Sequence, residues 1–246
     1  MGSNLVEVDL STIEKKRGGI ICVLDAMIDV TCNGIDSKRI RIIEQCSSTN
    51  ALIYNSSNGH GNAVCSIIHQ INNEVGIDFY PVSKNDNINQ ITNILEYIYN
   101  YEDSCIINMS FGFFISERDA DLLKSICCKL SSRKFLLIAA NPSLRACVYP
   151  ASFSNVVEVF LGKPNNVFSI EIASEKELNL VVNEAESLVW WRKDYIISCR
   201  AASFSAARIS ALLALAICGI VPNRKEYISA WELLSVLSVN NRFLPA

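Results

Sequence analysis

The chain has 246 residues, 50% hydrophobic and 19% charged, which is enough to bury one sizeable core as a single domain. Its formal net charge of -3 and its dispersed basic residues provide no positive field for phosphates, so nucleic acid is excluded as an expected partner. The most apolar stretch, 209–221, is shorter than the roughly 20 residues of a membrane span, and residues 1–18 contain no secretory signal pattern. These features predict a cytoplasmic protein without a membrane span.

Apolar strands alternate with amphipathic helices along the chain. The run 19–24 is short, apolar and bounded by glycines and an aspartate, which predicts a buried parallel strand with Asp25 at its carboxyl end. Helical periodicity over 62–71 begins just after Gly59-His60-Gly61, so His60 is expected at a helix entrance. Further strands are predicted over 104–109, 134–140 and 155–161, strands and loops over 178–202, and helices over 87–99, 117–130, 204–218 and 225–238.

This strand–helix order predicts an α/β fold with three αβα layers around a mostly parallel central sheet. In such folds the functional residues gather at strand ends and helix starts. The ten cysteines lie mostly in apolar runs and form no C-x-x-C pair, so they are interpreted as buried, reduced thiols rather than as a zinc site or disulfide framework.

Catalysis by a serine needs a base, a carboxylate that orients the base, and donors for the oxyanion. The chain has only two histidines, so the choice of base is narrow. His69 falls within the helix over 62–71 and is interpreted as a surface or packing residue. His60 lies between two glycines that permit close approach of other groups, and it is the better candidate.

Four segments in order carry a family resemblance: VLDAMID at 23–29, NGHGNAV at 58–64, IINMSFG at 106–112 and AASFSAARI at 201–209. The segments LIAAN at 137–141 and YPA at 149–151 agree as well. Residues 19–217 thus resemble the subtilases, the subtilisin-like serine peptidases. The order Asp, His, Ser is that of subtilisin, whereas an α/β-hydrolase requires a histidine after its serine, and this chain has none.

The resemblance implies a subtilisin-like fold over 19–246, preceded by an N-terminal extension over 1–18. It assigns the catalytic triad to Asp25, His60 and Ser203, and an oxyanion-hole amide to Asn141. Ser203 also precedes a predicted helix, whose N-terminal N–H groups add donors and a favourable dipole beside the developing oxyanion.

Substrate contacts are implied by the same resemblance. The segment Ser110, Phe111 and Gly112 is expected to border the groove and pair with substrate backbone. Ala139, Ala140 and Val148 are expected to form the pocket for the P1 side chain, which belongs to the substrate residue whose carbonyl is attacked. Because Ala140 and Val148 stand where glycines are usual in the family, the pocket is expected to be shallow and to favour small P1 residues.

The resemblance implies a serine endopeptidase acting on a peptide or protein substrate, with no cofactor and no metal. A restricted intracellular task is expected, for example removal of a leader from a peptide precursor. The alternative is a catalytically inactive binding module, because Ala201, Ala202 and Ala207 replace the family's glycine, threonine and proline. The loop around Asn73 resembles a calcium loop, but the family's supporting aspartate falls near Gly34, so an empty structural loop is expected.

Overall fold

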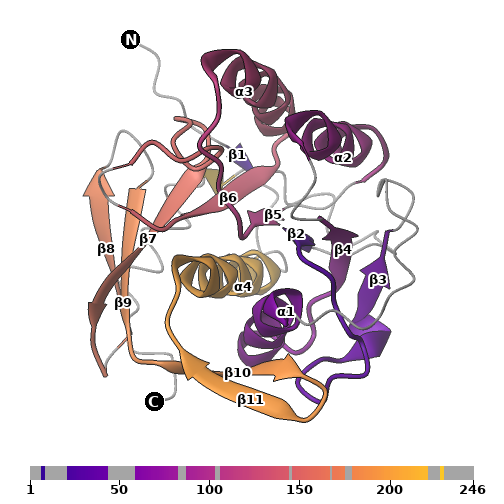
Figure 1. Cartoon of the computed structure of the whole chain (residues 1–246), viewed down its shortest axis with the longest axis vertical. Helices are drawn as coiled ribbons and strands as arrows, with labels where there is room; N and C mark the ends of the chain where they lie inside the picture. The colour runs from indigo at the N-terminus through magenta and orange to yellow at the C-terminus, as the bar shows by residue number, and fades with distance from the viewer. Residues whose placement is uncertain are drawn as a thin grey trace.

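An eight-stranded sheet runs through the middle of the protein in the order β3-β4-β2-β5-β6-β7-β9-β8 (Figure 1). The computed structural model describes residues 7–8, 21–43, 59–82, 87–102, 106–143, 146–166, 168–174, 179–220 and 228–229. Every pair of neighbouring strands is parallel except β8 and β9, which confirms the predicted sheet type. The strands are β2 (Ile21–Asp25), β3 (Ile40–Ile42), β4 (Ile77–Pro81), β5 (Ile106–Met109), β6 (Leu136–Asn141), β7 (Val157–Pro164), β8 (Ser169–Ser174) and β9 (Asn179–Glu184).

Helices cover both faces of this sheet, as the predicted three-layer αβα fold requires (Figure 1). On one face lie α1 (His60–Ile71) and α4 (Ala202–Ile220), which pack against each other. On the other face lie α2 (Ile88–Tyr101) and α3 (Glu117–Ser132). The hairpin of β10 (Ser187–Arg192) and β11 (Tyr195–Cys199) packs on α1, and a short 3-10 helix, η2 (Ser37–Arg39), leads into β3.

The two hydrophobic cores follow from the alternation of side chains along the strands. In β2, Ile21 and Val23 point into the core beneath α1 and α4, whereas Cys22 and Leu24 point into the core beneath α2 and α3. All four side chains are fully buried. A strand buried on both faces has no polar side, and this is why the run 19–24 is continuously apolar.

Helices α1 and α2 begin differently, and the start of α1 is where His60 lies. Helix α2 begins with a capping box: the Oδ1 atom of Asn87 accepts from the N–H of Gln90 (3.1 Å), and the Oε1 atom of Gln90 accepts from the N–H of Asn87 (2.8 Å). Helix α1 instead follows Gly59, whose absent side chain provides no cap. His60 is therefore the first residue of a helix whose first N–H groups have no intrahelical partner.

Some elements differ from the sequence-based expectation. Strands β3, β4 and β8 are additional, and the predicted helix over 225–238 is wrong at Ile228–Ser229, which form strand β12. Strand β12 pairs antiparallel with β1 (Glu7–Val8), within the predicted N-terminal extension. The rest of 225–238 lies outside the described residues. In the part of the chain that the structure describes, no helix is long and apolar enough to cross a membrane.

Candidate active site

Three elements far apart in the sequence converge at one edge of the sheet. Asp25 is the last residue of β2, His60 is the first residue of α1, and Ser203 is the second residue of α4. The N-termini of the helices that cover a parallel sheet meet the carboxyl ends of its strands, because those helices run antiparallel to the strands. The fold therefore brings together the three side chains that the sequence singles out.

These side chains form a continuous hydrogen-bonded chain. The Nδ1 atom of His60 lies 2.7 Å from Oδ1 of Asp25, and its Nε2 atom lies 2.9 Å from Oγ of Ser203. A carboxylate only accepts hydrogen bonds, so Nδ1 carries the proton and Nε2 is free to accept from the hydroxyl of Ser203. This tautomer is the one in which a histidine can remove a proton from a serine.

Asp25 is only 3% exposed, and its Oδ1 atom also accepts from the N–H of Ala26 (2.6 Å). Its other oxygen, Oδ2, is buried and has no hydrogen-bond partner among the described residues. A buried carboxylate is stabilised by the donors that contact it, and here these donors are Nδ1 of His60 and the N–H of Ala26. The aspartate is therefore fixed against the imidazole.

The ring of His60 is also held by aromatic contacts. Phe204, the neighbour of Ser203, stacks on it with ring centroids 5.5 Å apart, and Trp191 of β10 meets it edge-on at 6.4 Å. A Cβ atom on Gly59 would lie 1.6 Å from the carbonyl oxygen of Trp191, so only glycine allows this approach of hairpin and helix. Gly59 is thus required for the packing of the β10–β11 hairpin against the start of α1.

The two histidines differ in their electrostatic surroundings. Burial disfavours the protonated form of His60, but the charge of Asp25 and its hydrogen bond outweigh burial and raise the pKa of His60 above its ordinary value of 6.5. Burial is the main influence on His69, and it lowers the pKa of that histidine below 6.5. A neutral His60 is the form that accepts the proton of Ser203.

An NMR titration of the imidazole protons is expected to give one midpoint above 6.5, from His60, and one below it, from His69. Because only neutral His60 can act as the base, the peptidase activity proposed below is expected to fall as the pH drops through the upper midpoint, that of His60. The Asp25→Asn variant removes the charge that raises the pKa of His60, so its upper midpoint should move down. Two midpoints that both lie at or below 6.5 would contradict this description of the site.

A chain of side-chain hydrogen bonds connects strand β5 to α4, the helix that contains Ser203. The Nδ2 atom of Asn108 donates to Oγ of Ser210 on α4 (2.9 Å), and Ser110 donates to Oδ1 of Asn108 (2.6 Å). Ser110 Oγ also lies 3.4 Å from the carbonyl oxygen of Ser203. The segment Ser110–Gly112, predicted to border the groove, thus begins beside the serine.

Two of the residues predicted to form the P1 pocket, Ala140 and Val148, lie close together beside Gly112. Gly112 faces Val148: a Cβ atom on Gly112 would lie 2.2 Å from Cγ1 of Val148 and 3.6 Å from the carbonyl oxygen of Ala140. The two segments are held by reciprocal backbone hydrogen bonds between Phe113 and Tyr149 (2.9 and 3.0 Å). The side chain of Val148, 1% exposed, therefore fills the space beside Gly112 and Ala140.

Ala139 and Ala140 belong to different cores. Ala140 packs with the core beneath α1 and α4, whereas Ala139 points to the opposite face, among the residues beneath α2 and α3. Adjacent residues of a strand point to opposite faces, so only one of the two side chains faces the side of the sheet on which α4 lies. Any role of Ala139 toward a substrate would therefore be played by its backbone.

Asn141 ends strand β6, next to β5 in the sheet, and is 1% exposed. Its Nδ2 atom donates to Oε1 of Glu158 (2.7 Å) and to the carbonyl of Ala146 (3.2 Å), and its Oδ1 atom accepts from the N–H of Ser143 (2.9 Å). Both amide hydrogens thus have protein acceptors in this structure. Sequence reasoning missed Glu158, although a glutamate within the apolar run VVEVF was a detectable signal.

The first turns of α4 are anchored by a second buried glutamate. Glu184, at the end of β9, accepts from Oγ of Ser205 (2.7 Å) and from Nε of Arg208 (2.8 Å). Arg208 also donates to Oγ of Ser187 (2.8 Å). Because a buried ion pair is costly to break from one side, this cluster fixes the helix that carries Ser203 against β9 and β10.

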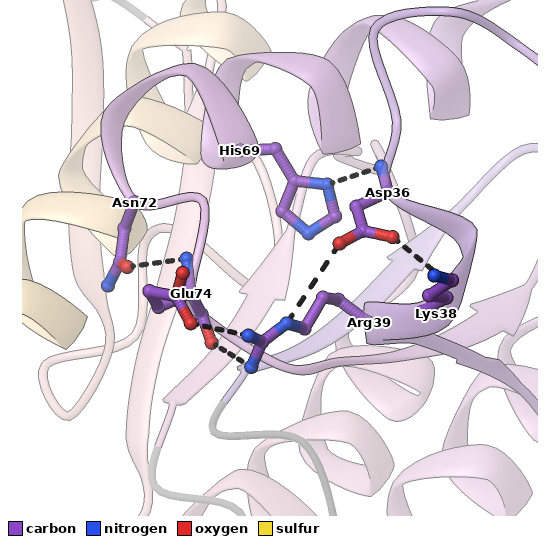
Figure 2. Close-up of polar contacts among 6 residues, drawn as sticks. All are labelled: Asp36, Lys38, Arg39, His69, Asn72 and Glu74. Atoms are coloured by element: carbon purple, nitrogen blue, oxygen red, sulfur yellow. Dashed lines mark hydrogen bonds and ion pairs between the residues drawn. The ribbon is translucent and has the colours of Figure 1, made fainter.

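The opposite end of α1 contains the loop that resembles a calcium loop (Figure 2). Nη1 of Arg39 donates to the carbonyl of Glu74 (3.0 Å), and Nη2 pairs with its carboxylate. Asn72 accepts from the N–H of Glu74 (3.2 Å), and Nδ1 of His69 accepts from the N–H of Asp36 (3.2 Å). His69 is thus a buried packing residue rather than a surface one. The guanidinium of Arg39 contacts the loop that resembles a calcium loop. Among the described residues, no cluster of three or more His, Cys, Asp or Glu is arranged to hold a metal ion.

Comparison with known proteins identifies the fold. No protein-family model matches the chain, and no curated protein matches it. Among solved structures, the prenylagaramide maturation protease PagA is similar with a TM-score of 0.63 and 20% identity, over 87% of this chain and 82% of that protein. A lanthipeptide protease is similar with a TM-score of 0.64 and 13% identity, over 92% and 82%. At these identities, the likeness establishes a shared fold.

Proposed function

We propose that this protein is a subtilisin-like serine endopeptidase that processes a peptide precursor. The observation that carries this proposal is the hydrogen-bonded chain from Asp25 through His60 to Ser203, built from three separate elements at one edge of the sheet. Three polar side chains in this order and geometry match the requirements of an activated serine. The resemblance of the four sequence segments to the subtilases supports the same conclusion.

In this reaction the Oγ atom of Ser203 attacks the carbonyl carbon of the scissile bond while Nε2 of His60 takes its proton. Asp25 stabilises the imidazolium that forms, and the proton then passes to the leaving amine, which departs and leaves an acyl-enzyme. Water deprotonated by His60 releases the acyl group from Ser203. Asp25 and Ser203 each lie within hydrogen-bond distance of His60, the group that moves the proton in these steps.

The oxyanion needs donors that are already in place. Ser203 lies in the first turn of α4, where backbone N–H groups have no intrahelical partner and the helix dipole favours negative charge. We assign the second donor to the amide of Asn141. In this structure both hydrogens of that amide have protein acceptors, Glu158 and the carbonyl of Ala146, so stabilising the oxyanion requires the longer contact, to Ala146 at 3.2 Å, to open.

The choice of substrate rests on the similar structures and on the residues near the serine. The two similar structures are named as a prenylagaramide maturation protease and a lanthipeptide protease. The side chain of Val148 occupies the space beside Gly112, where the resemblance to the subtilases puts the P1 pocket, so we expect little room for a large P1 residue. We therefore propose a precursor that is cleaved after a small residue.

A peptide library tests this proposal. Wild-type protein is incubated with a library of varied peptides, and new termini are identified by mass spectrometry, with the Ser203→Ala variant as the blank. We expect cleavage at a restricted set of sites that the variant does not produce. Folded wild-type protein that cleaves no peptide would favour a catalytically inactive binding module, and broad cleavage of casein at many sites would contradict a restricted task.

Val148 gives a prediction about specificity. Phosphonate probes with a methyl or a benzyl group in the P1 position label an activated serine, and wild type is expected to react faster with the methyl probe. Val148→Ala removes two methyl groups beside Gly112, so the preference for the methyl probe should fall about tenfold or more. Val156→Ala, the same change at a buried position away from Gly112, is the control. A wild-type preference for the benzyl probe would show that Val148 does not limit the pocket.

A further inference from the structure

Arg200 is a charged residue close to the start of α4. The carbonyl oxygen of Ala201, the next residue, accepts the first hydrogen bonds of this helix, from the N–H groups of Phe204 (3.0 Å) and Ser205 (3.1 Å). Arg200 lies three residues before Ser203, so their Cα atoms are no more than about 11 Å apart. Its side chain is half-buried. A positive charge therefore lies near the proposed nucleophile.

The guanidinium of Arg200 has a single hydrogen-bond acceptor among the described residues. Its Nη2 atom donates to the carbonyl oxygen of Gly162 in β7 (2.9 Å), and its buried Nε atom has no partner there. A guanidinium has five N–H donors, so Nη1 and the second hydrogen of Nη2 remain for another acceptor. The contact with Gly162 thus holds the group in place while most of its donors stay unused.

Arg200 also differs from three other arginines in its charge environment. Arg39, Arg41 and Arg208 each lie within ion-pair distance of at least one carboxylate. No carboxylate in the described part of the chain lies that close to Arg200. A half-buried charge has lost part of its hydration and is stabilised by a partner of opposite charge. This position is therefore suited to a ligand that supplies a carboxylate.

Arg200 and the predicted substrate segment lie on opposite sides of Ser203. Helix α4 packs over β5, β6 and β7, which are neighbours in the sheet in this order. Ser110, directly after β5, lies 3.4 Å from the carbonyl oxygen of Ser203, whereas Arg200 donates to Gly162 near the end of β7. A peptide whose acyl part lies along Ser110–Gly112 and crosses Ser203 therefore continues toward Arg200. Residues of an extended peptide are spaced about 3.3 Å apart, so the first residues after the scissile bond come within reach of the guanidinium.

We propose that Arg200 selects precursors with an acidic side chain at one of the first three positions after the scissile bond, P1′ to P3′. This inference rests on the proposed function. A carboxylate can accept two parallel hydrogen bonds from a guanidinium, and such charge-assisted pairs are among the stronger contacts in proteins. Arg200 takes no part in bond breaking. It is a specificity-determining residue that raises kcat/KM for an acidic substrate.

The test uses the best library peptide with aspartate or asparagine at each of these three positions in turn. The two side chains have nearly the same shape, so the ratio of their kcat/KM values measures the effect of the charge. Wild-type protein is expected to favour aspartate about fivefold or more at one position. Arg200→Gln, which retains a donor for Gly162, should lose this preference, and Arg200→Lys, which retains the charge, should keep part of it. A general loss of activity cancels in the ratio.

Arg133→Gln is the matched control. It removes the same charge at the C-terminal end of α3, where the guanidinium lies over the rings of Tyr99 (5.2 Å) and Phe135 (5.7 Å). The preference for aspartate should be unchanged in this variant. Added salt should weaken the wild-type preference, because salt screens the attraction between charges, whereas a preference based on shape would not respond.

The outcomes distinguish this inference from the proposed function. Wild-type protein that cleaves no library peptide and gives no fluorophosphonate adduct on Ser203 contradicts the proposed function and the inference with it. Cleavage without a preference for aspartate at any of the three positions overturns the inference alone. A preference that persists in Arg200→Gln, or that is lost equally in Arg133→Gln, also overturns it, because the charge of Arg200 would then not be its source.

Discussion

Replacing His60 by alanine is expected to lower the cleavage rate of the best library peptide by roughly a millionfold. Among the described residues, His60 is the base that contacts the hydroxyl of Ser203, with its Nε2 atom 2.9 Å from the serine oxygen. The only other histidine of the chain, His69, lies near the C-terminal end of α1 and accepts from the N–H of Asp36. The rate is measured with the substrate that the library identifies. The double variant His60→Ala with Ser203→Ala should be no slower than either single variant, because the residues act as a unit.

His69→Ala is the control for this experiment. His69 is buried and packs at the end of α1, so its replacement should lower the melting temperature while the cleavage rate of folded protein stays near that of wild type. Retention of more than a hundredth of the wild-type rate by a folded His60→Ala variant would contradict the role of His60 as the base.

Replacing Asp25 by asparagine is expected to lower the cleavage rate about 10,000-fold without loss of the fold. The asparagine amide donates to Nδ1 of His60, which moves the imidazole proton to Nε2. A protonated Nε2 points a donor at Ser203 and cannot accept its proton. The Oδ1 contact at 2.7 Å in the wild-type protein is what prevents this tautomer.

Asp29→Asn is the matched control, four residues along the chain. Asp29 is half-buried, and its Oδ1 atom accepts from the N–H and the hydroxyl of Thr31 (2.9 and 2.7 Å), contacts that involve neither His60 nor Ser203. This variant should cleave at the wild-type rate. Comparable losses in Asp25→Asn and Asp29→Asn would mean that the tautomer explanation is wrong, and circular dichroism verifies that both variants are folded.

The fold was predictable where the pattern of side chains has one interpretation. The continuous apolar run before Asp25 indicated a strand buried on both faces, and the apolar stripe after His60 indicated a helix. The structure buries that helix on nearly all sides, because α4 and the β10–β11 hairpin also pack on it. Strand β4 was missed because Asp78 interrupts its apolar pattern. That carboxylate is 1% exposed and accepts from Nε of Arg41 (2.8 Å), a contact that depends on a residue 37 positions earlier.

The site was predictable to a different degree for each residue. The sequence placed Asp25, His60 and Ser203 at a strand end and at two helix starts, and in the structure their side chains meet within 2.9 Å. The partners of these elements were not predictable. Glu158 and Glu184 are single acidic residues in apolar strands, and which side chain each one contacts is decided by the packing of strands and helices brought together only in the fold.

The most direct test of the central claim is fluorophosphonate labelling of the purified protein beside its Ser203→Ala variant, followed by mass spectrometry of the modified peptide. An activated serine predicts one adduct, on Ser203, that is absent from the variant and greatly slowed in His60→Ala. Folded wild-type protein without an adduct, or with an adduct elsewhere that persists in Ser203→Ala, would contradict the claim that Asp25, His60 and Ser203 form a working catalytic triad.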